Sequence, residues 1–332
     1  MKKELNKKTK YLIIGIVLLL IIASIIIIKI FHNPKEEPKK NENTTIKENI
    51  TPLMYEITKN GSNNKIYLFG SIHIANTNKL NFPDYVNNAF NQSNYIACEF
   101  DLIEFQKDQN KVMQMMQDML YQDGSTIKDH LSTNTYNKLV NFLKEKEMYS
   151  EIYDIYKPIF FESLITNIMA NDTKIATNDG IDAYFLNKAK KEGKKILEIE
   201  SADYQTNLLS NFSDKLYELM LVDLIDNYDQ EVKSLMDLYE AWKKGDIERI
   251  LNESSDELEI KSNYTKEEIN LIKEYNKDLI DNRNIDMTNK LIEYFNNNYD
   301  TFYMVGAAHL VGDKGIAHLL ETKGYTVKQI SN

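Results

Sequence analysis

The 332-residue chain has few of the residues on which several common kinds of site depend. Its one cysteine, Cys98, excludes an internal disulfide and any zinc or iron–sulfur site built from several cysteines. With 11 Gly and 5 Pro it is not a fibrous chain, and with 42% hydrophobic residues it is not a disordered one. The motifs HExxH, G-x-S-x-G, G-x-x-x-x-G-K-[ST] and G-x-G-x-x-G do not occur, so zincins, serine hydrolases and nucleotide- or dinucleotide-binding proteins have no support.

Basic residues are fewer than acidic residues in the chain as a whole, but they outnumber acidic residues at its N-terminus. The formal net charge is −10, so an extended basic face for nucleic acid is not expected. Residues 1–40 nevertheless hold nine Lys against three Glu, which gives them +6 and leaves −16 for residues 41–332.

An uncharged apolar run from Tyr11 to Ile28 follows the first five lysines. As a helix, its eighteen residues would be long enough to span a hydrocarbon core of ~30 Å together with its interfacial flanks. A cleavable signal peptide has a shorter apolar region that ends at small residues, whereas Ala23 and Ser24 lie inside this run. We therefore expect an uncleaved transmembrane helix.

The lysines before this helix place the N-terminus in the cytoplasm and the remainder outside the membrane. The expected segments are a cytoplasmic tail (1–10), a transmembrane helix (11–30), a polar linker (31–50) and one extracytoplasmic domain (51–332). The predicted location is the cell membrane, with a single pass.

Two strand–helix–strand units lie far apart in the domain. They comprise residues 66–69, 83–93 and 95–100 in the first unit, and 301–305, 313–324 and 325–330 in the second. Between them apolar residues recur at three- and four-residue spacing, which predicts helices, and one further run at 195–199 fits a strand. We expect an α/β (α+β) domain with a sheet built from two distant βαβ-like repeats and an inserted helical subdomain.

Two of the five histidines end matching strands. His73 follows Gly70 in YLFGSIH, and His309 follows Gly306 in FYMVGAAH. Glycine allows a close backbone approach, and open α/β sheets bind ligands at the carboxyl ends of their strands, so the pattern strand–Gly–x–x–His presents an imidazole at that edge. The other histidines lie in polar segments or in a predicted helix, and we expect no role for them in the site: His32, His130 and His318.

Acidic residues end the second strand of the first unit. Glu99 lies in an otherwise apolar run, where a buried charge requires a partner, and Asp101 is on the same strand face. Cys98 points to the opposite face and fits a small core residue better than a nucleophile. Two imidazoles and one or two carboxylates can bind a divalent transition metal with positions open for water, as metal-dependent hydrolysis requires. Histidines held by hydrogen bonds, with Glu99 in a structural ion pair, fit the same spacing.

These motifs, in this order, resemble the TraB/GumN family, also called the TraB/PrgY/GumN or Tiki-like family. The resemblance runs from about Met54 to the C-terminus and rests on YLFGSIH (67–73), CEFD (98–101), GIDAYFLNKAKKEGKKILEIES (180–201) with Gln205, Trp242 with Gly245-Asp246, DNRN (281–284) and MVGAAHLVGDKGIAHLLETKGYTV (304–327). It implies one site formed by Gly70/His73, Glu99 and Gly306/His309.

The resemblance also implies a function. Animal members similar to this group are membrane-tethered proteases that depend on manganese or cobalt, and related folds include erythromycin-esterase-like proteins. Arg283 matches the family's Arg-Asn motif, where a cation can bind a peptide carboxylate or an oxyanion; a structural ion pair is the alternative. Pheromone-shutdown members commonly carry C-terminal membrane segments, whereas the apolar run here is N-terminal, so pheromone biology is not carried over.

We therefore expect a membrane-anchored, extracytoplasmic, metal-dependent peptidase-like hydrolase that acts on peptides or proteins. His73, His309 and Glu99 would hold manganese, cobalt or zinc; alternatively Glu99 is the general base and Asp101 the ligand. Two other functions stay open: sequestration of an extracellular peptide without cleavage, and erythromycin-esterase-like hydrolysis of a small molecule.

Overall fold

The computed structural model describes residues 47–175, 180–254 and 264–331. Within these ranges no helix is both long and apolar enough to cross a membrane. The predicted tail and transmembrane helix, and most of the predicted linker, lie outside the described residues.

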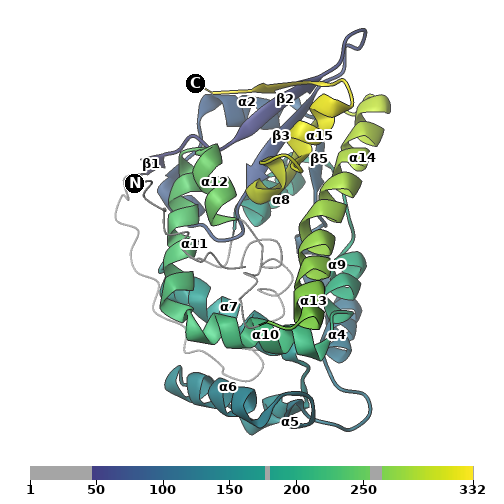
Figure 1. The fold of residues 1–332 in the computed structure, drawn as a ribbon. Coiled ribbons are helices and arrows are strands. Elements are labelled where there is room, and N and C mark those ends of the chain that lie inside the picture. The colour runs from purple at the N-terminus through teal and green to yellow at the C-terminus, as the bar shows by residue number, and fades with distance from the viewer. Residues whose placement is uncertain (1–46, 176–179, 255–263, 332) are drawn as a thin grey trace, which may run out of the picture.

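A six-stranded sheet, in the order β6-β5-β7-β3-β2-β8, forms one end of the molecule (Figure 1). Its strands are β2 (Met54–Thr58), β3 (Ile66–Ser71), β5 (Tyr95–Cys98), β6 (Lys195–Glu198), β7 (Thr301–Gly306) and β8 (Thr326–Gln329). Strands β6, β5, β7 and β3 are parallel, and β2 runs antiparallel between β3 and β8. The predicted mixed α/β class is confirmed, with a mostly parallel sheet; the antiparallel strand β2 was not predicted.

Strands of both predicted repeats belong to this sheet, and the repeats interleave. Helix α2 (Asp84–Gln92) joins β3 to β5, and α15 (Ile316–Thr322) joins β7 to β8. The first strands of the two repeats, β3 and β7, are direct neighbours, with Ser71 paired to Gly306. The two Gly-x-x-His segments therefore leave the sheet side by side.

The other α-helices of the described residues lie between β5 and β7 in the sequence, where β6 interrupts them. The helices are α3 (Leu102–Lys107), α4 (Gln109–Asp118), α5 (Ile127–His130), α6 (Thr133–Glu145), α7 (Pro158–Asp172), α8 (Ile181–Glu192), α9 (Ala202–Ser210), α10 (Asp214–Asp226), α11 (Tyr228–Lys243), α12 (Ile247–Glu253), α13 (Lys266–Asn276) and α14 (Arg283–Asn296). In Figure 1, α5 and α6 lie farthest from the sheet, and α11 and α13–α14 run between the two ends.

Short elements complete the description. Strands β1 (Glu48–Asn49) and β4 (Leu80–Asn81) form a separate parallel pair, and η1 (Thr77–Lys79), η2 (Glu151–Ile155) and η4 (Ala307–Leu310) are 3₁₀ turns. Segment η3 (Lys277–Asn282) is π-helical and joins α13 directly to α14.

An aromatic cluster fixes α8 against the two central strands. Phe69 on β3 stacks on Phe302 on β7, with ring centroids 5.2 Å apart. Phe185 on α8 lies 5.4 Å from the first ring and 5.1 Å from the second. All three side chains are fully buried, so the N-terminal turn of α8 is held close to the ends of these strands.

Candidate active site

Four parallel strands end at the same edge of the sheet and deliver the central residues of the site. His73 follows β3, Glu99 follows β5, Glu200 follows β6 and His309 follows β7. The Glu200 amide donates to the Glu99 carbonyl at 2.8 Å, so these two strand ends remain paired beyond the sheet. This is the edge at which open α/β sheets bind ligands.

The side chains of three sequence-predicted residues face one point beside Gly306. A Cβ atom placed on this glycine would lie 3.6 Å from His309 Cδ2, 3.8 Å from Glu99 Oε1 and 4.0 Å from His73 Nε2. A side chain at this position would fill the space between the imidazoles and the carboxylate. We call this space the Gly306 cradle.

Asp182 at the start of α8 holds His73. Its Oδ2 lies 2.8 Å from His73 Nδ1, and its Oδ1 accepts a hydrogen bond of 2.9 Å from Ser71 Oγ. Burial alone would lower the pKa of His73, but the charge of Asp182 and this hydrogen bond outweigh burial and raise it. Gly180 allows the approach, since a Cβ there would lie only 2.2 Å from the His73 carbonyl oxygen.

Asn284 on α14 holds the second imidazole. Its Oδ1 lies 2.6 Å from His309 Nδ1, and its Nδ2 donates to the Lys314 carbonyl at 2.9 Å. Burial, and then the positive charge of Arg283, lower the pKa of His309 to about 3. This ring is therefore neutral at physiological pH.

Glu99 is held by three donors. Its Oε1 accepts from the Gly306 amide at 3.1 Å, while its Oε2 accepts from Gln205 Nε2 at 3.0 Å and from Arg283 Nη2 at 2.9 Å. Burial would raise the pKa of this carboxyl, but the adjacent guanidinium overcomes burial, and the pKa falls to about 2. Glu99 is thus a buried, ionised and oriented carboxylate.

Arg283 lies between Glu99 and Glu200. Its Nε and Nη2 contact Glu200 Oε1 and Oε2 at 2.8 and 2.9 Å, and its Nη1 donates to the Leu279 carbonyl at 3.4 Å. The side chain is 2% exposed. The structure therefore shows the buried ion pair that the sequence left open as an alternative, and the guanidinium faces protein carboxylates rather than an open anion site.

Asp101 is not brought into this group. Its Oδ2 forms an ion pair with Lys190 Nζ at 2.7 Å, and its Oδ1 accepts from the Glu104 amide as the N-cap of α3. The reason is local: β5 ends at Cys98, so the alternation of strand faces does not extend to position 101. Cys98 itself is a buried core residue, and burial raises the pKa of its thiol well above the usual value.

The cluster supplies suitable donors for a divalent metal, but not a complete ligand set. Within the described ranges, no three His, Cys, Asp or Glu side chains are arranged to hold a metal ion. Both imidazoles engage a protein partner through Nδ1, which leaves Nε2 as the ligand atom. Glu99 and Glu200 share the single guanidinium of Arg283, and the buried carboxylate of Asp182 pairs with His73; this excess of negative charge favours a cation.

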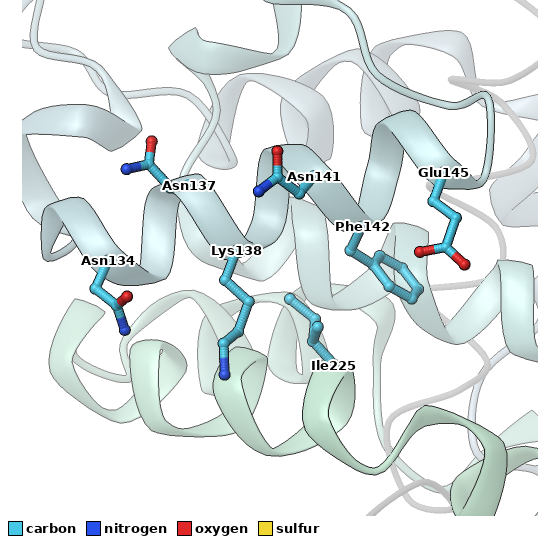
Figure 2. A pocket seen from close by; sticks show the side chains of 7 residues that line it. All are labelled: Asn134, Asn137, Lys138, Asn141, Phe142, Glu145 and Ile225. Atoms are coloured by element: carbon cyan, nitrogen blue, oxygen red, sulfur yellow. The ribbon is translucent and has the colours of Figure 1, made fainter.

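The hollow in Figure 2 lies elsewhere, and none of the residues above lines it. Its volume is about 430 Å³, and α6 and α10 line it with Asn134, Asn137, Lys138, Asn141, Phe142, Glu145 and Ile225. It contains no histidine, and Lys138 is paired with Asp226. Glu145 is the one carboxylate among these lining residues, so this hollow lacks the combination of imidazoles and carboxylates found beside Gly306.

Sequence reasoning gave no role to four residues that the structure places in the site: Asp182, Glu200, Gln205 and Asn284. One local signal was present. Glu200 follows the apolar run at 195–199 much as Glu99 ends its own strand. Asp182, Gln205 and Asn284 belong to segments quoted for the family resemblance, but spacing alone gives them no role, because an Asp, Gln or Asn on a helix is usually solvated.

Comparison with protein families matches residues 53–329 to the TraB/PrgY/gumN family. The chain belongs to this family. The predicted resemblance is therefore confirmed, and it covers nearly all of the described residues.

Two similar proteins are named as proteases. The chain is 22% identical to a protein named "Metalloprotease TIKI homolog" from Nematostella vectensis, over 91% of this chain and 72% of the relative. It is 22% identical to "Metalloprotease TIKI2" from Xenopus tropicalis, over 79% of this chain and 57% of the relative, so it spans little more than half of that protein. No solved structure matches the chain.

Proposed function

We propose that this TraB/PrgY/gumN family protein is a metal-dependent hydrolase of peptide bonds, with its reaction centre at the Gly306 cradle. The observation that carries the proposal is the pairing of two inward-facing imidazoles with an excess of buried negative charge. The names of the two relatives support peptides as the substrate.

The charge argument starts from the cost of burial. An uncompensated buried charge is strongly destabilising, by about 3–5 kcal/mol when one partner of a buried pair is lost. Asp182, Glu99 and Glu200 carry three negative charges against one on Arg283. Protonation of His73 would compensate one of the two surplus charges, and a divalent cation would compensate both.

His73 and His309 would hold the metal through Nε2. When bound, a divalent metal polarises a carbonyl and lowers the pKa of bound water. The pKa of Glu99 at about 2 makes it a poor general base, so of the two roles expected from the sequence the structure favours an anionic ligand through Oε1. Arg283 and Gln205 keep this carboxylate ionised and oriented.

Metal content and peptide cleavage test the proposal together. The full chain, stripped with a chelator, is loaded separately with manganese, cobalt or zinc and incubated with a peptide library. His73→Ala and His309→Ala should lose both metal and cleavage. His318→Ala is the matched control, since Gly315-x-x-His318 has the same spacing but its side chain is 50% exposed.

Each other outcome contradicts the proposal in a distinct way. Metal-free protein that binds peptides without cleaving them would indicate sequestration. Hydrolysis of esters but of no peptide would indicate the erythromycin-esterase-like alternative. Unchanged metal content in the His73→Ala and His309→Ala variants would show that the metal binds outside the cradle.

We also propose that the apolar run at 11–28 anchors the protein, with the hydrolase domain outside the cytoplasm. The charge asymmetry of residues 1–40 supports this orientation. Protease added to intact cells should release the domain from about residue 50 onward. Protection of the domain until the cells are lysed would reverse the proposed orientation.

A further inference from the structure

We propose that Asp182 and Asn284 are positioning residues that hold both imidazoles as Nδ1–H tautomers, so that the Nε2 lone pairs of His73 and His309 face the Gly306 cradle. The inference deepens the proposed function and rests on it only where a metal is concerned. The tautomers follow from hydrogen-bond chemistry alone.

For His73 the assignment follows from a partner that only accepts. A carboxylate has no proton to donate, so the contact of 2.8 Å between Asp182 Oδ2 and His73 Nδ1 requires the proton on the ring nitrogen. Ser71 Oγ donates to the other carboxylate oxygen at 2.9 Å, which fixes the plane of the carboxylate. Both side chains of the pair are nearly buried, at 5% and 4% exposure.

For His309 the assignment needs one more step, because an amide can both donate and accept. The Lys314 carbonyl can only accept, so the atom of Asn284 that lies 2.9 Å from it must be the NH₂ nitrogen. The amide oxygen then faces His309 Nδ1 at 2.6 Å. The ring nitrogen must donate, and the backbone of Lys314 thereby determines the tautomer of His309.

The free edges of both rings point to the same place. His73 Nε2 lies 4.0 Å from the position of a Cβ on Gly306, and His309 Cδ2, which is bonded to Nε2, lies 3.6 Å from it. With Nδ1 protonated in each neutral ring, each Nε2 carries a lone pair. His73 Nε2 and the Cδ2–Nε2 edge of His309 thus border one cradle.

Asp182 is charged and Asn284 is neutral, so the two imidazoles differ in basicity. A carboxylate opposite Nδ1–H raises the basicity of the imidazole more than a neutral amide does. His73 should therefore be the stronger donor. Replacing Asp182 should weaken the binding of a transition-metal ion more than replacing Asn284, with losses in the range of ~10–100-fold.

Nitrogen NMR of the full chain labelled with ¹⁵N-histidine tests the tautomers directly. Long-range proton–nitrogen correlations distinguish Nδ1–H from Nε2–H rings at about pH 9, where histidines are ordinarily neutral. Wild-type His73 and His309 should both be Nδ1–H. Asp182→Leu should change only His73, and Asn284→Leu only His309.

Conservative variants separate positioning from packing. Asp182→Asn can turn its amide oxygen to Nδ1 and should keep the tautomer of His73. Asn284→Asp sets a carboxylate oxygen against the Lys314 carbonyl and should lower stability, but its other oxygen still accepts from His309 Nδ1, so a folded variant should keep the Nδ1–H tautomer. Ser71→Ala removes a donor to Asp182 but leaves the acceptor for His73, and should not change the tautomer.

A ring protonated only at Nε2, at either histidine of the wild type, would overturn the inference even if no variant folds. So would an unchanged tautomer in a folded Asp182→Leu or Asn284→Leu protein. Calorimetric titration with zinc supplies the second measurement. Correct tautomers without metal binding would refute the proposed function and leave the positioning role standing.

Discussion

Gly306 allows the cradle to be blocked by a single methyl group. Its backbone angles, φ −51° and ψ 137°, are accessible to alanine. The nearest atoms to the new Cβ would be His309 Cδ2 at 3.6 Å, Glu99 Oε1 at 3.8 Å and His73 Nε2 at 4.0 Å, all ordinary van der Waals distances. We therefore predict that Gly306→Ala folds normally and loses the proposed metal binding and peptide cleavage.

The same contacts set the expected changes in the free energy of unfolding and in the rate. Gly→Ala at a compatible conformation stabilises a protein by about 0.4–1 kcal/mol through the unfolded state, and the methyl group offsets part of this by covering polar atoms. The free energy of unfolding should thus change by less than about 1 kcal/mol. A ligand atom that contacts both His73 and Glu99 would have to move by roughly 1 Å or more, and such a displacement costs on the order of 100-fold in rate.

Gly70→Ala is the comparison variant. It adds the same methyl group to the other Gly-x-x-His motif, where the group crowds neighbouring atoms instead of filling the cradle. A Cβ on Gly70 would lie 3.0 Å from Ala307 Cα, a backbone atom, and 3.3 Å from Leu310 Cδ2. Overpacking of this kind costs about 1–3 kcal/mol. Urea unfolding followed by fluorescence gives the free energy of unfolding of each variant. Metal titration gives its metal affinity, and peptide cleavage gives its rate. A Gly306→Ala protein that binds metal and cleaves peptides like the wild type would refute the cradle as the reaction centre.

Three further changes have defined outcomes. Gly180→Ala would place a Cβ 2.2 Å from the His73 carbonyl oxygen, and thermal unfolding should show a loss of about 1–3 kcal/mol. Arg283→Met leaves two buried carboxylates unpaired and should cost about 3–5 kcal/mol in urea unfolding, part of which Glu200→Gln in the same chain should restore. Burial raises the pKa of Glu162 to about 8, so the native state keeps a proton that the unfolded state releases above pH ~4.5, and stability falls as pH rises between these values. Glu162→Gln should match the wild type near pH ~5 and exceed it by up to roughly 5 kcal/mol near pH ~9, as measured by urea unfolding at each pH.

The strand ends of the site were predictable because their signal is local. A buried apolar run that stops at glycine and delivers a histidine three residues later marks the carboxyl end of a strand in both β3 and β7. Their adjacency was not predictable, because β7 lies between β3 and β5 and the two repeats interleave. Only the paired register of Ser71 and Gly306 brings His73 and His309 to one cradle.

Asp101 shows where local reasoning failed. The alternation of faces predicts that it accompanies Glu99 only while the strand continues, and β5 ends at Cys98. Asp101 is then recruited as an N-cap, a role that Asp commonly takes where a loop enters a helix. The carboxylate that does face His73 comes from Asp182, and no spacing in the sequence links these two residues.

The helical region from α13 to α14 explains why Arg283 and Asn284 could not be placed from periodicity. The apolar spacing over residues 267–298 fits one continuous α-helix, but segment η3 inside it is π-helical. A π-helical turn accommodates extra backbone and shifts the phase of all later residues, so a helical wheel drawn from α13 points the start of α14 to the wrong face. Arg283 and Asn284 follow the segment immediately, and they contact Glu99 and His309 respectively. The irregular turn therefore aims two consecutive side chains at two different strand ends.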